Sequence, residues 1–160
     1  MTINLSQKER SLLEDQKKHE ELCVKKYTNH AKQAEDQELK QLFNTYAQEE
    51  QQHLNTVNQI LSGQVPNMNQ QQGQQQSQQK KQQVNSKTSG NISMNNINDA
   101  MLCSDLLMTE KYVSSTYDTA IFECQDTNIR NPLNHIQKEE QQHGESIYNY
   151  MASKGMYNVQ

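Results

Sequence analysis

The chain contains the same five-residue motif twice. Glu49-Glu50-Gln51-Gln52-His53 returns as Glu139-Glu140-Gln141-Gln142-His143, ninety positions further on. Thirty residues before the second glutamate of each copy stands another glutamate, Glu20 or Glu110. The chain is therefore a tandem duplication, and we expect its two halves to fold alike.

Apolar residues at 3.6-residue spacing predict four helices, two in each half. The first is expected at about 5–34, the second at 37–61 after an Asp36 cap, and the third from Asn98 or Asp99 to about 125. The fourth helix has two alternative starts. Asn131 could cap it with Pro132 in the first turn, or the duplication places its start at Asp126 and leaves Pro132 inside.

The repeated acidic and histidine residues fall on the apolar stripes of these helices. Glu50 and His53 are three residues apart and share one helix face, whereas Glu49 is rotated by about 100° toward solvent. Ferritin-like di-iron and di-manganese bundles use this inward set, a Glu from two helices and Glu-x-x-His from the other two. The sequence predicts a dinuclear site with the ligands Glu20, Glu50, His53, Glu110, Glu140 and His143.

The alternative interpretation of these six residues is that they are ordinary buried polar side chains. A lone glutamate on an apolar stripe more often pairs with a lysine, but here six residues match between two halves. Four buried carboxylates are costly to desolvate, and no lysine or arginine shares their stripes. Two divalent cations, iron or manganese, would neutralise them. We expect Glu50 and Glu140 to bridge the ions, with Glu20 and Glu110 as terminal ligands.

Residues 64–97 separate the two halves and differ from them in composition. Gln, Asn, Ser and Lys dominate this segment, which predicts a disordered crossover. The expected organisation is a first helical hairpin at 1–63, the linker at 64–97 and a second hairpin at 98–160. The two hairpins are expected to form one domain, an all-α, ferritin-like four-helix bundle.

Composition and charge argue against several functions. A net charge of -4 without a basic stripe speaks against nucleic acid binding. No apolar run approaches the roughly 20 residues of a membrane span, and no signal-peptide hydrophobic region follows Met1, so we expect neither membrane binding nor secretion. Cys23, Cys103 and Cys124 lack Cys-x-x-Cys spacing, which predicts reduced, buried thiols.

Tyr27 and Tyr117 also correspond at the ninety-residue offset. Each lies two helical turns, roughly 10 Å, beyond the glutamate of its own helix, which is too far for direct ligation. We expect both tyrosines to pack in the core.

The second half resembles the coat F family of spore coat proteins. The resemblance rests on Asp105-Leu106-Leu107-Met108-Thr109-Glu110-Lys111-Tyr112, on the second copy of the motif, and on Lys154-Gly155-Met156-Tyr157, and it covers about residues 99–157. The family implies a ferritin-like bundle made in the mother-cell cytoplasm of an endospore-forming bacterium and deposited in the spore coat. Its acidic and histidine pattern carries over onto Glu110, Glu140 and His143.

Two functions compete at this stage. In the preferred one the chain is a structural component of the endospore coat, with other coat proteins as partners and self-association into a homo-oligomer left open. In the alternative, the dinuclear centre is a peroxide- or dioxygen-reactive oxidoreductase, similar to rubrerythrin, manganese catalase or ferroxidase. Fold analogy alone supports enzymatic activity.

Overall fold

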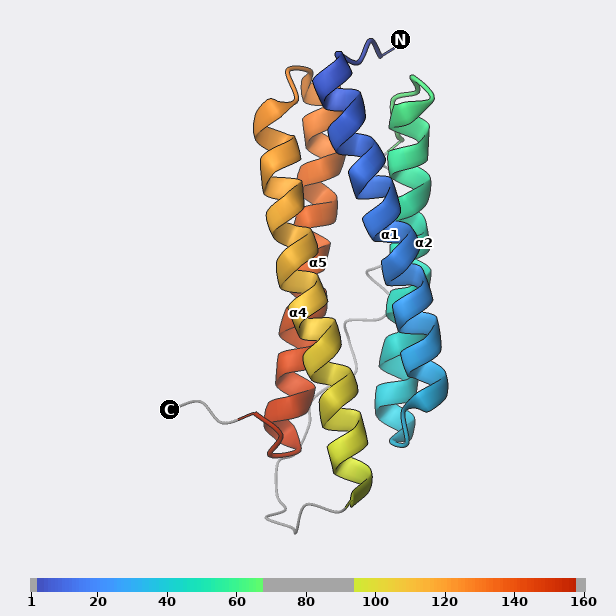
Figure 1. Ribbon diagram of the computed structural model, residues 1–160, viewed down its shortest axis with the longest axis vertical. Coiled ribbons are helices and arrows are strands. Elements are labelled where there is room, and N and C mark those ends of the chain that lie inside the picture. The colour runs from blue at the N-terminus through green and yellow to red at the C-terminus, as the bar shows by residue number, and fades with distance from the viewer. Residues whose placement is uncertain (1–2, 68–93, 158–160) are drawn as a thin grey trace.

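The described residues form four helices packed side by side (Figure 1). The computed structural model describes residues 3–67 and 94–157. The helices are α1 (Gln7–Gln33), α2 (Gln37–Leu61), α4 (Met94–Glu123) and α5 (Thr127–Ser153). The predicted all-α, four-helix bundle of two antiparallel hairpins is confirmed.

The two hairpins lie side by side (Figure 1), and residues of both contribute to each of the two apolar clusters. Helix α1 contacts α4, α2 contacts α5, and both of these pairs are antiparallel. The end of α2 and the start of α4 lie at opposite ends of the bundle. Most of the predicted disordered linker, residues 68–93, lies outside the described residues.

Both hairpins have short turns, and in each turn an aspartate caps the helix that follows. The side chain of Asp36 accepts a hydrogen bond from the Glu38 amide at 2.7 Å, and that of Asp126 accepts one from the Asn128 amide at 2.8 Å. The alternative start at Asn131 was therefore wrong. Pro132 lies inside α5, where its missing N–H leaves one backbone hydrogen bond unmade.

Two carboxylates, ninety residues apart, clamp the hairpins together. Glu9 accepts a hydrogen bond from the Gln125 amide at 2.9 Å, in the loop of the second hairpin. Asp99 accepts hydrogen bonds from the Glu35 and Asp36 amides, both at 2.9 Å, in the loop of the first. Each loop is thus held by a side chain of the opposite hairpin.

The third helix starts earlier than predicted. We expected its start at Asn98 or Asp99, whereas α4 begins at Met94. The Asp99 carboxylate is engaged by the opposite loop and does not act as a cap. Asn95 and Asn96 carry no apolar pattern that could have marked the first turn, so the predicted boundary at residue 98 falls inside the helix.

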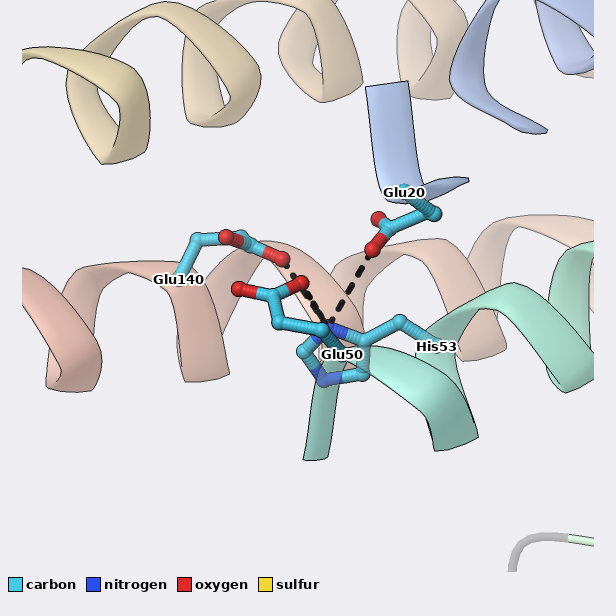
Figure 2. A group of neighbouring side chains, drawn as sticks. All are labelled: Glu20, Glu50, His53 and Glu140. Atoms are coloured by element: carbon cyan, nitrogen blue, oxygen red, sulfur yellow. Dashed lines mark hydrogen bonds and ion pairs between the residues drawn. The ribbon is translucent and has the colours of Figure 1, made fainter. Parts of the chain in front are cut away.

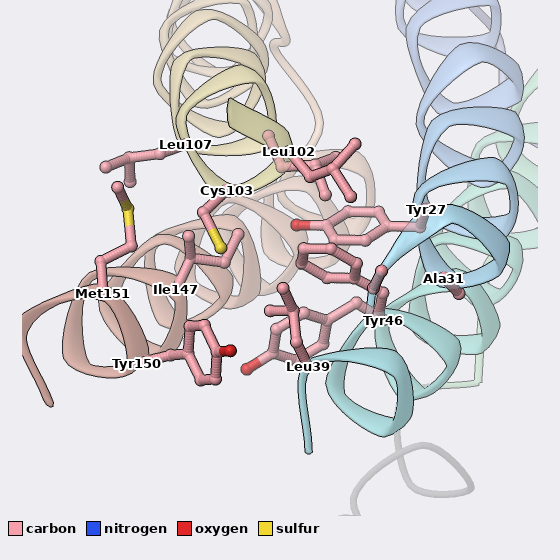
Figure 3. Close-up of a cluster of buried hydrophobic side chains, with 13 residues drawn as sticks. Tyr27, Ala31, Leu39, Tyr46, Leu102, Cys103, Leu107, Ile147, Tyr150 and Met151 are labelled. Atoms are coloured by element: carbon pink, nitrogen blue, oxygen red, sulfur yellow. The ribbon is translucent and has the colours of Figure 1, made fainter. Parts of the chain in front are cut away.

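Apolar side chains fill the bundle in two clusters, one toward each end. The cluster shown in Figure 3 surrounds Tyr27, Phe43 and Ile147, and the other surrounds Leu13, Val57 and Leu133. All three cysteines are buried and free, as predicted. Within the described residues, no helix combines the length and apolarity of a membrane span.

Candidate metal centre

The six predicted ligands meet between the two apolar clusters. All six are buried, and none is more than 3% exposed. They form two overlapping groups whose ligand atoms lie within 4.8 Å of one another, and both groups contain Glu50 and Glu140. Glu20 and His53 complete the first group, drawn in Figure 2, and Glu110 and His143 complete the second. The arrangement is one of two adjoining positions that share two carboxylates.

Both histidines turn Nδ1 toward the shared glutamates. His53 Nδ1 lies 2.9 Å from Glu140 Oε1 and 3.3 Å from Glu50 Oε2. His143 Nδ1 lies 3.2 Å from Glu50 Oε1 and 3.4 Å from Glu110 Oε1. Each position therefore combines one glutamate and one histidine of a single hairpin with the central glutamates of both.

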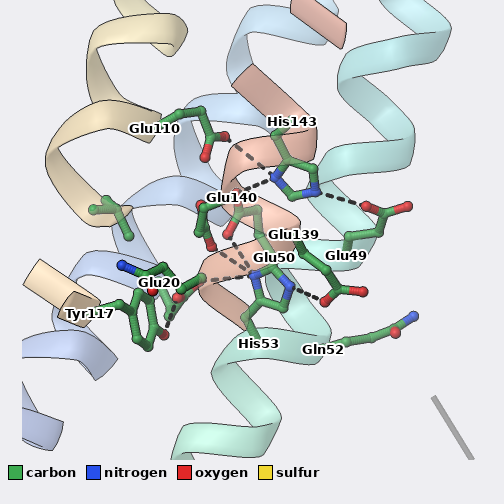
Figure 4. Close-up of polar contacts among 12 residues, drawn as sticks. Glu20, Glu49, Glu50, Gln52, His53, Glu110, Tyr117, Glu139, Glu140 and His143 are labelled. Carbon is green, nitrogen blue, oxygen red and sulfur yellow. Dashed lines mark hydrogen bonds and ion pairs between the residues drawn. The ribbon is translucent and has the colours of Figure 1, made fainter. Parts of the chain in front are cut away.

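The outer nitrogens of the histidines are held by the first glutamate of each motif (Figure 4). His53 Nε2 lies 2.7 Å from Glu139 Oε2, and His143 Nε2 lies 2.7 Å from Glu49 Oε2. A carboxylate on Nε2 fixes the ring orientation and leaves Nδ1 for a metal ion. The expected solvent position of Glu49 was wrong, because its carboxylate reaches the opposite hairpin. The two consecutive glutamates in each copy of the motif were the sequence feature that could have predicted these two carboxylate–histidine contacts.

The two histidine supports are not equivalent. Glu139 is buried, and its second oxygen lies 3.2 Å from His135 Nε2. The Glu49 side chain is 25% exposed. Thr45, the counterpart of His135 ninety residues earlier, has no imidazole to offer. The His53 position is therefore the more enclosed of the two.

The buried tyrosines reach the outer glutamates across the bundle. Tyr27 donates a hydrogen bond to Glu110 Oε1, and Tyr117 donates one to Glu20 Oε1. Both rings lie in the core, as expected, but the role of their hydroxyls was missed. Each tyrosine lies two helical turns away from the glutamate of its own helix. Because α1 and α4 pack antiparallel, its hydroxyl instead reaches the glutamate of the other hairpin.

Several carboxylate oxygens of the cluster lack a hydrogen-bond donor. Among the described residues, Glu20 Oε2, Glu110 Oε2 and both oxygens of Glu140 have none. Glu140 Oε1 is close to His53 Nδ1, but not in the alignment of a hydrogen bond. No lysine or arginine in this part of the chain pairs with the six residues. Bare, buried carboxylate oxygens are costly, and divalent cations would satisfy them, so the residues fit a metal pair.

Burial and mutual repulsion shift the acidity of the central groups. Burial raises the pKa of Glu20 and Glu140, and the Glu50 carboxylate raises it further. Burial acts on Glu50 in the same direction, but its contacts with His143 and His53 hold its pKa below the usual range. In the absence of cations, Glu20 and Glu140 therefore hold a proton more tightly than an ordinary glutamate does.

The histidines are shifted by the same surroundings. Burial lowers the pKa of His53 and His143, but the hydrogen bonds and negative charges of nearby glutamates outweigh it and raise the pKa of both. Cations at this cluster would displace protons from imidazoles and carboxyl groups, so their binding would release protons.

The fold and the site define a class, a helical bundle with a buried cluster of glutamates and histidines built from two equivalent hairpins. The family model described as Coat F domain matches residues 98–160. The predicted resemblance to the coat F family is thereby confirmed for the second hairpin, and it supports a spore coat protein. No curated protein and no solved structure matches the chain.

Proposed function

We propose that this chain is a spore coat protein whose bundle holds a dinuclear iron or manganese centre and which serves mainly as a structural component of the coat. One observation carries the metal proposal: the two groups of potential ligands share Glu50 and Glu140. Each of the two groups contains one histidine and neither contains both, which favours two ions over one. The Coat F domain at 98–160 supports the coat assignment.

The residues take distinct roles in this proposal. Glu20 and His53 would hold one ion, Glu110 and His143 would hold the other, and Glu50 and Glu140 would serve both positions. A bound pair of iron or manganese ions would supply positive charge and one-electron chemistry at the bundle centre. Glu139 and Glu49 orient the imidazoles, and the apolar clusters keep bulk water away from both positions.

The metal proposal is tested by elemental analysis of the purified chain after expression with added iron or manganese. About two ions per chain are expected, with loss of both in Glu50→Ala and in Glu140→Ala. The matched control is Glu14→Ala, which removes an exposed glutamate of α1 and should leave the metal content unchanged. A content below about a tenth of an ion per chain would instead make the cluster a polar core without metal.

A peroxide-consumption assay on the same samples separates the structural role from the oxidoreductase alternative. The structural proposal expects metal-loaded parent protein and Glu50→Ala to consume peroxide at the same background rate. A metal-dependent rate that is lost in Glu50→Ala would favour the enzyme.

The coat assignment is tested in a sporulating bacterium. We place the synthesis of the chain in the mother cell and its final position in the coat, in contact with other coat proteins. A tagged copy should surround the forespore and be extractable from purified spores. Its confinement to the cytoplasm of vegetative cells would rule out the coat role.

A further inference from the structure

Helix α4 presents an uncharged face to solvent along most of its length. The positions of this face are three or four residues apart and fall within an arc of about 80°. Five of its side chains are large and apolar, and their exposure runs from 54% at Ile97 to 83% at Phe122. The α4 face consists of Ile97, Met101, Ser104, Met108, Tyr112, Ser115, Thr119 and Phe122.

The duplication provides an internal comparison for this face. The same positions in α1, ninety residues earlier, are Gln7, Ser11, Glu14, Lys18, Leu22, Lys25, Asn29 and Lys32, and they are exposed as well. Four of them are charged and only one is apolar. The bundle therefore does not require apolar residues here. A contiguous apolar surface that the fold does not need is typical of an interaction site.

The apolar residues of the α4 face are arranged symmetrically. Ile97 and Tyr112 are equally far from the midpoint between Ser104 and Asp105, and so are Met101 and Met108. If two copies of α4 cross antiparallel at this midpoint, Ile97 of each copy meets Tyr112 of the other. Met101 meets Met108 in the same way. A surface that is complementary to itself is the mark of a twofold, closed interface.

We propose that α4 pairs with α4 of a second copy of this chain, antiparallel and centred near Ser104, to form a symmetric dimer. The pairing set consists of Ile97, Met101, Met108 and Tyr112. Its exposed side chains offer on the order of 500 Å² per copy, so a dimer would bury about 1,000 Å² in total, the lower bound for a specific interface. A groove of about 240 Å³ between α1 and α4, lined by Leu22, Met108 and Tyr112, adjoins the set and enlarges the contact.

The chain's own residues 68–93 are a poorer match for this face. Met68, Val84 and Ile92 are the only large apolar residues among them, and they are widely separated. A second copy, in contrast, supplies four apolar side chains at the matching spacing. The dimer goes beyond the proposed function and does not depend on metal, because Glu110 lies on the opposite side of α4, in the core.

Sedimentation velocity of the full chain at tens of micromolar tests the proposal. The parent should sediment as a dimer, and the pair Met101→Glu with Met108→Glu should give a monomer, since four like charges would meet at the interface. The matched control changes the equivalent α1 positions, Ser11→Glu with Lys18→Glu, and should remain dimeric. Phe122→Ser should also remain dimeric, because Phe122 is not part of the pairing set.

A cysteine at the centre tests the register. Ser104→Cys should form a disulfide-linked dimer under mild oxidation, whereas Ser115→Cys, which is also exposed but off centre, should not. The native cysteines are buried and should not interfere. Circular dichroism and metal content should match the parent in every variant, so a failed dimer leaves the metal proposal untouched.

Two results would overturn the dimer. One is a monomeric parent, and the other is a dimer that persists in the Met101→Glu, Met108→Glu protein. If the parent is monomeric and the chain with Met68, Val84 and Ile92 changed to serine is dimeric, the α4 face belongs to the chain's own segment.

Discussion

Tyr27 and Tyr117 each hold a glutamate of the opposite hairpin. Removing either hydroxyl leaves one more buried carboxylate oxygen without a donor, next to oxygens that already lack one. Tyr117→Phe and Tyr27→Phe should each lower the free energy of unfolding by about 1–3 kcal/mol, measured by denaturant titration. Tyr157→Phe is the control, since this exposed ring lies away from the centre and should lose nothing measurable. Equal stability of all three variants would show that the crossed hydrogen bonds do not stabilise the fold.

The shifted groups of the cluster predict how the stability of the metal-free protein depends on pH. Glu20, Glu140, His53 and His143 have pKa values raised above their ordinary values of 4.5 and 6.5. Each therefore stabilises the fold below its ordinary pKa, and this contribution is lost as pH rises through the folded-state value. The pKa of Glu50 is lowered, so its contribution is lost only in stronger acid.

Stability of the chelated protein should accordingly fall between about pH 5 and about pH 8. Denaturant titrations across this range, with and without bound metal, measure the effect. The metal-loaded protein should show a flatter profile, because cations replace the protons. A chelated protein whose stability rises with pH would contradict the predicted protonation of the cluster.

At the scale of single residues, the sequence predicted the six central side chains and missed the four that hold them. Periodicity and the ninety-residue repeat are enough to place Glu50 and His53 on one buried stripe. They say nothing about contacts between helices. Glu49 and Tyr27 contact residues of the opposite hairpin. Those contacts depend on how the helices pack against each other, and a local sequence pattern does not contain that information.

At the scale of the elements, the carboxylate clamp ties each hairpin loop to the opposite hairpin. Asp99→Asn should turn an amide nitrogen toward one of the two loop N–H groups and lower the free energy of unfolding by about 1–3 kcal/mol. The effect is measured by thermal or denaturant unfolding. Asp118→Asn, an exposed aspartate of the same helix, should change it little. A similar loss in both variants would mean that the clamp carries no stability of its own.

Helix ends were harder to predict than helix faces. The stripes of α2 and α5 were predicted correctly because burial repeats every turn. The start of α5 needed the duplication to decide between Asp126 and Asn131, since each residue can cap a helix. The start of α4 was missed because its first turn is polar and because Asp99, a good cap by type, serves the neighbouring loop.

At the scale of the whole molecule, the melting temperature should depend on whether the proposed pair of metal ions is bound. Adding a strong chelator at neutral pH should lower the melting temperature of the loaded protein by roughly 5–15 °C. The effect should be smaller in mild acid, where protons take over the neutralising role. The Glu50→Ala, Glu140→Ala double variant controls for unspecific effects of the chelator and should not respond. A parent that melts at the same temperature with and without chelator would argue against bound metal.

Six contacts of the centre cross from one hairpin to the other, and they form three pairs related by the ninety-residue repeat. A single hairpin pairing with its own copy about a twofold axis would already make both tyrosine contacts, both glutamate–histidine contacts and both loop clamps. The present chain thus has the layout of an ancestral dimer whose two subunits became one polypeptide. Fusion removes the constraint that both halves stay identical. His135 in place of Thr45, and an apolar outer side on α4 where α1 has a charged one, are differences that a dimer of identical hairpins could not hold.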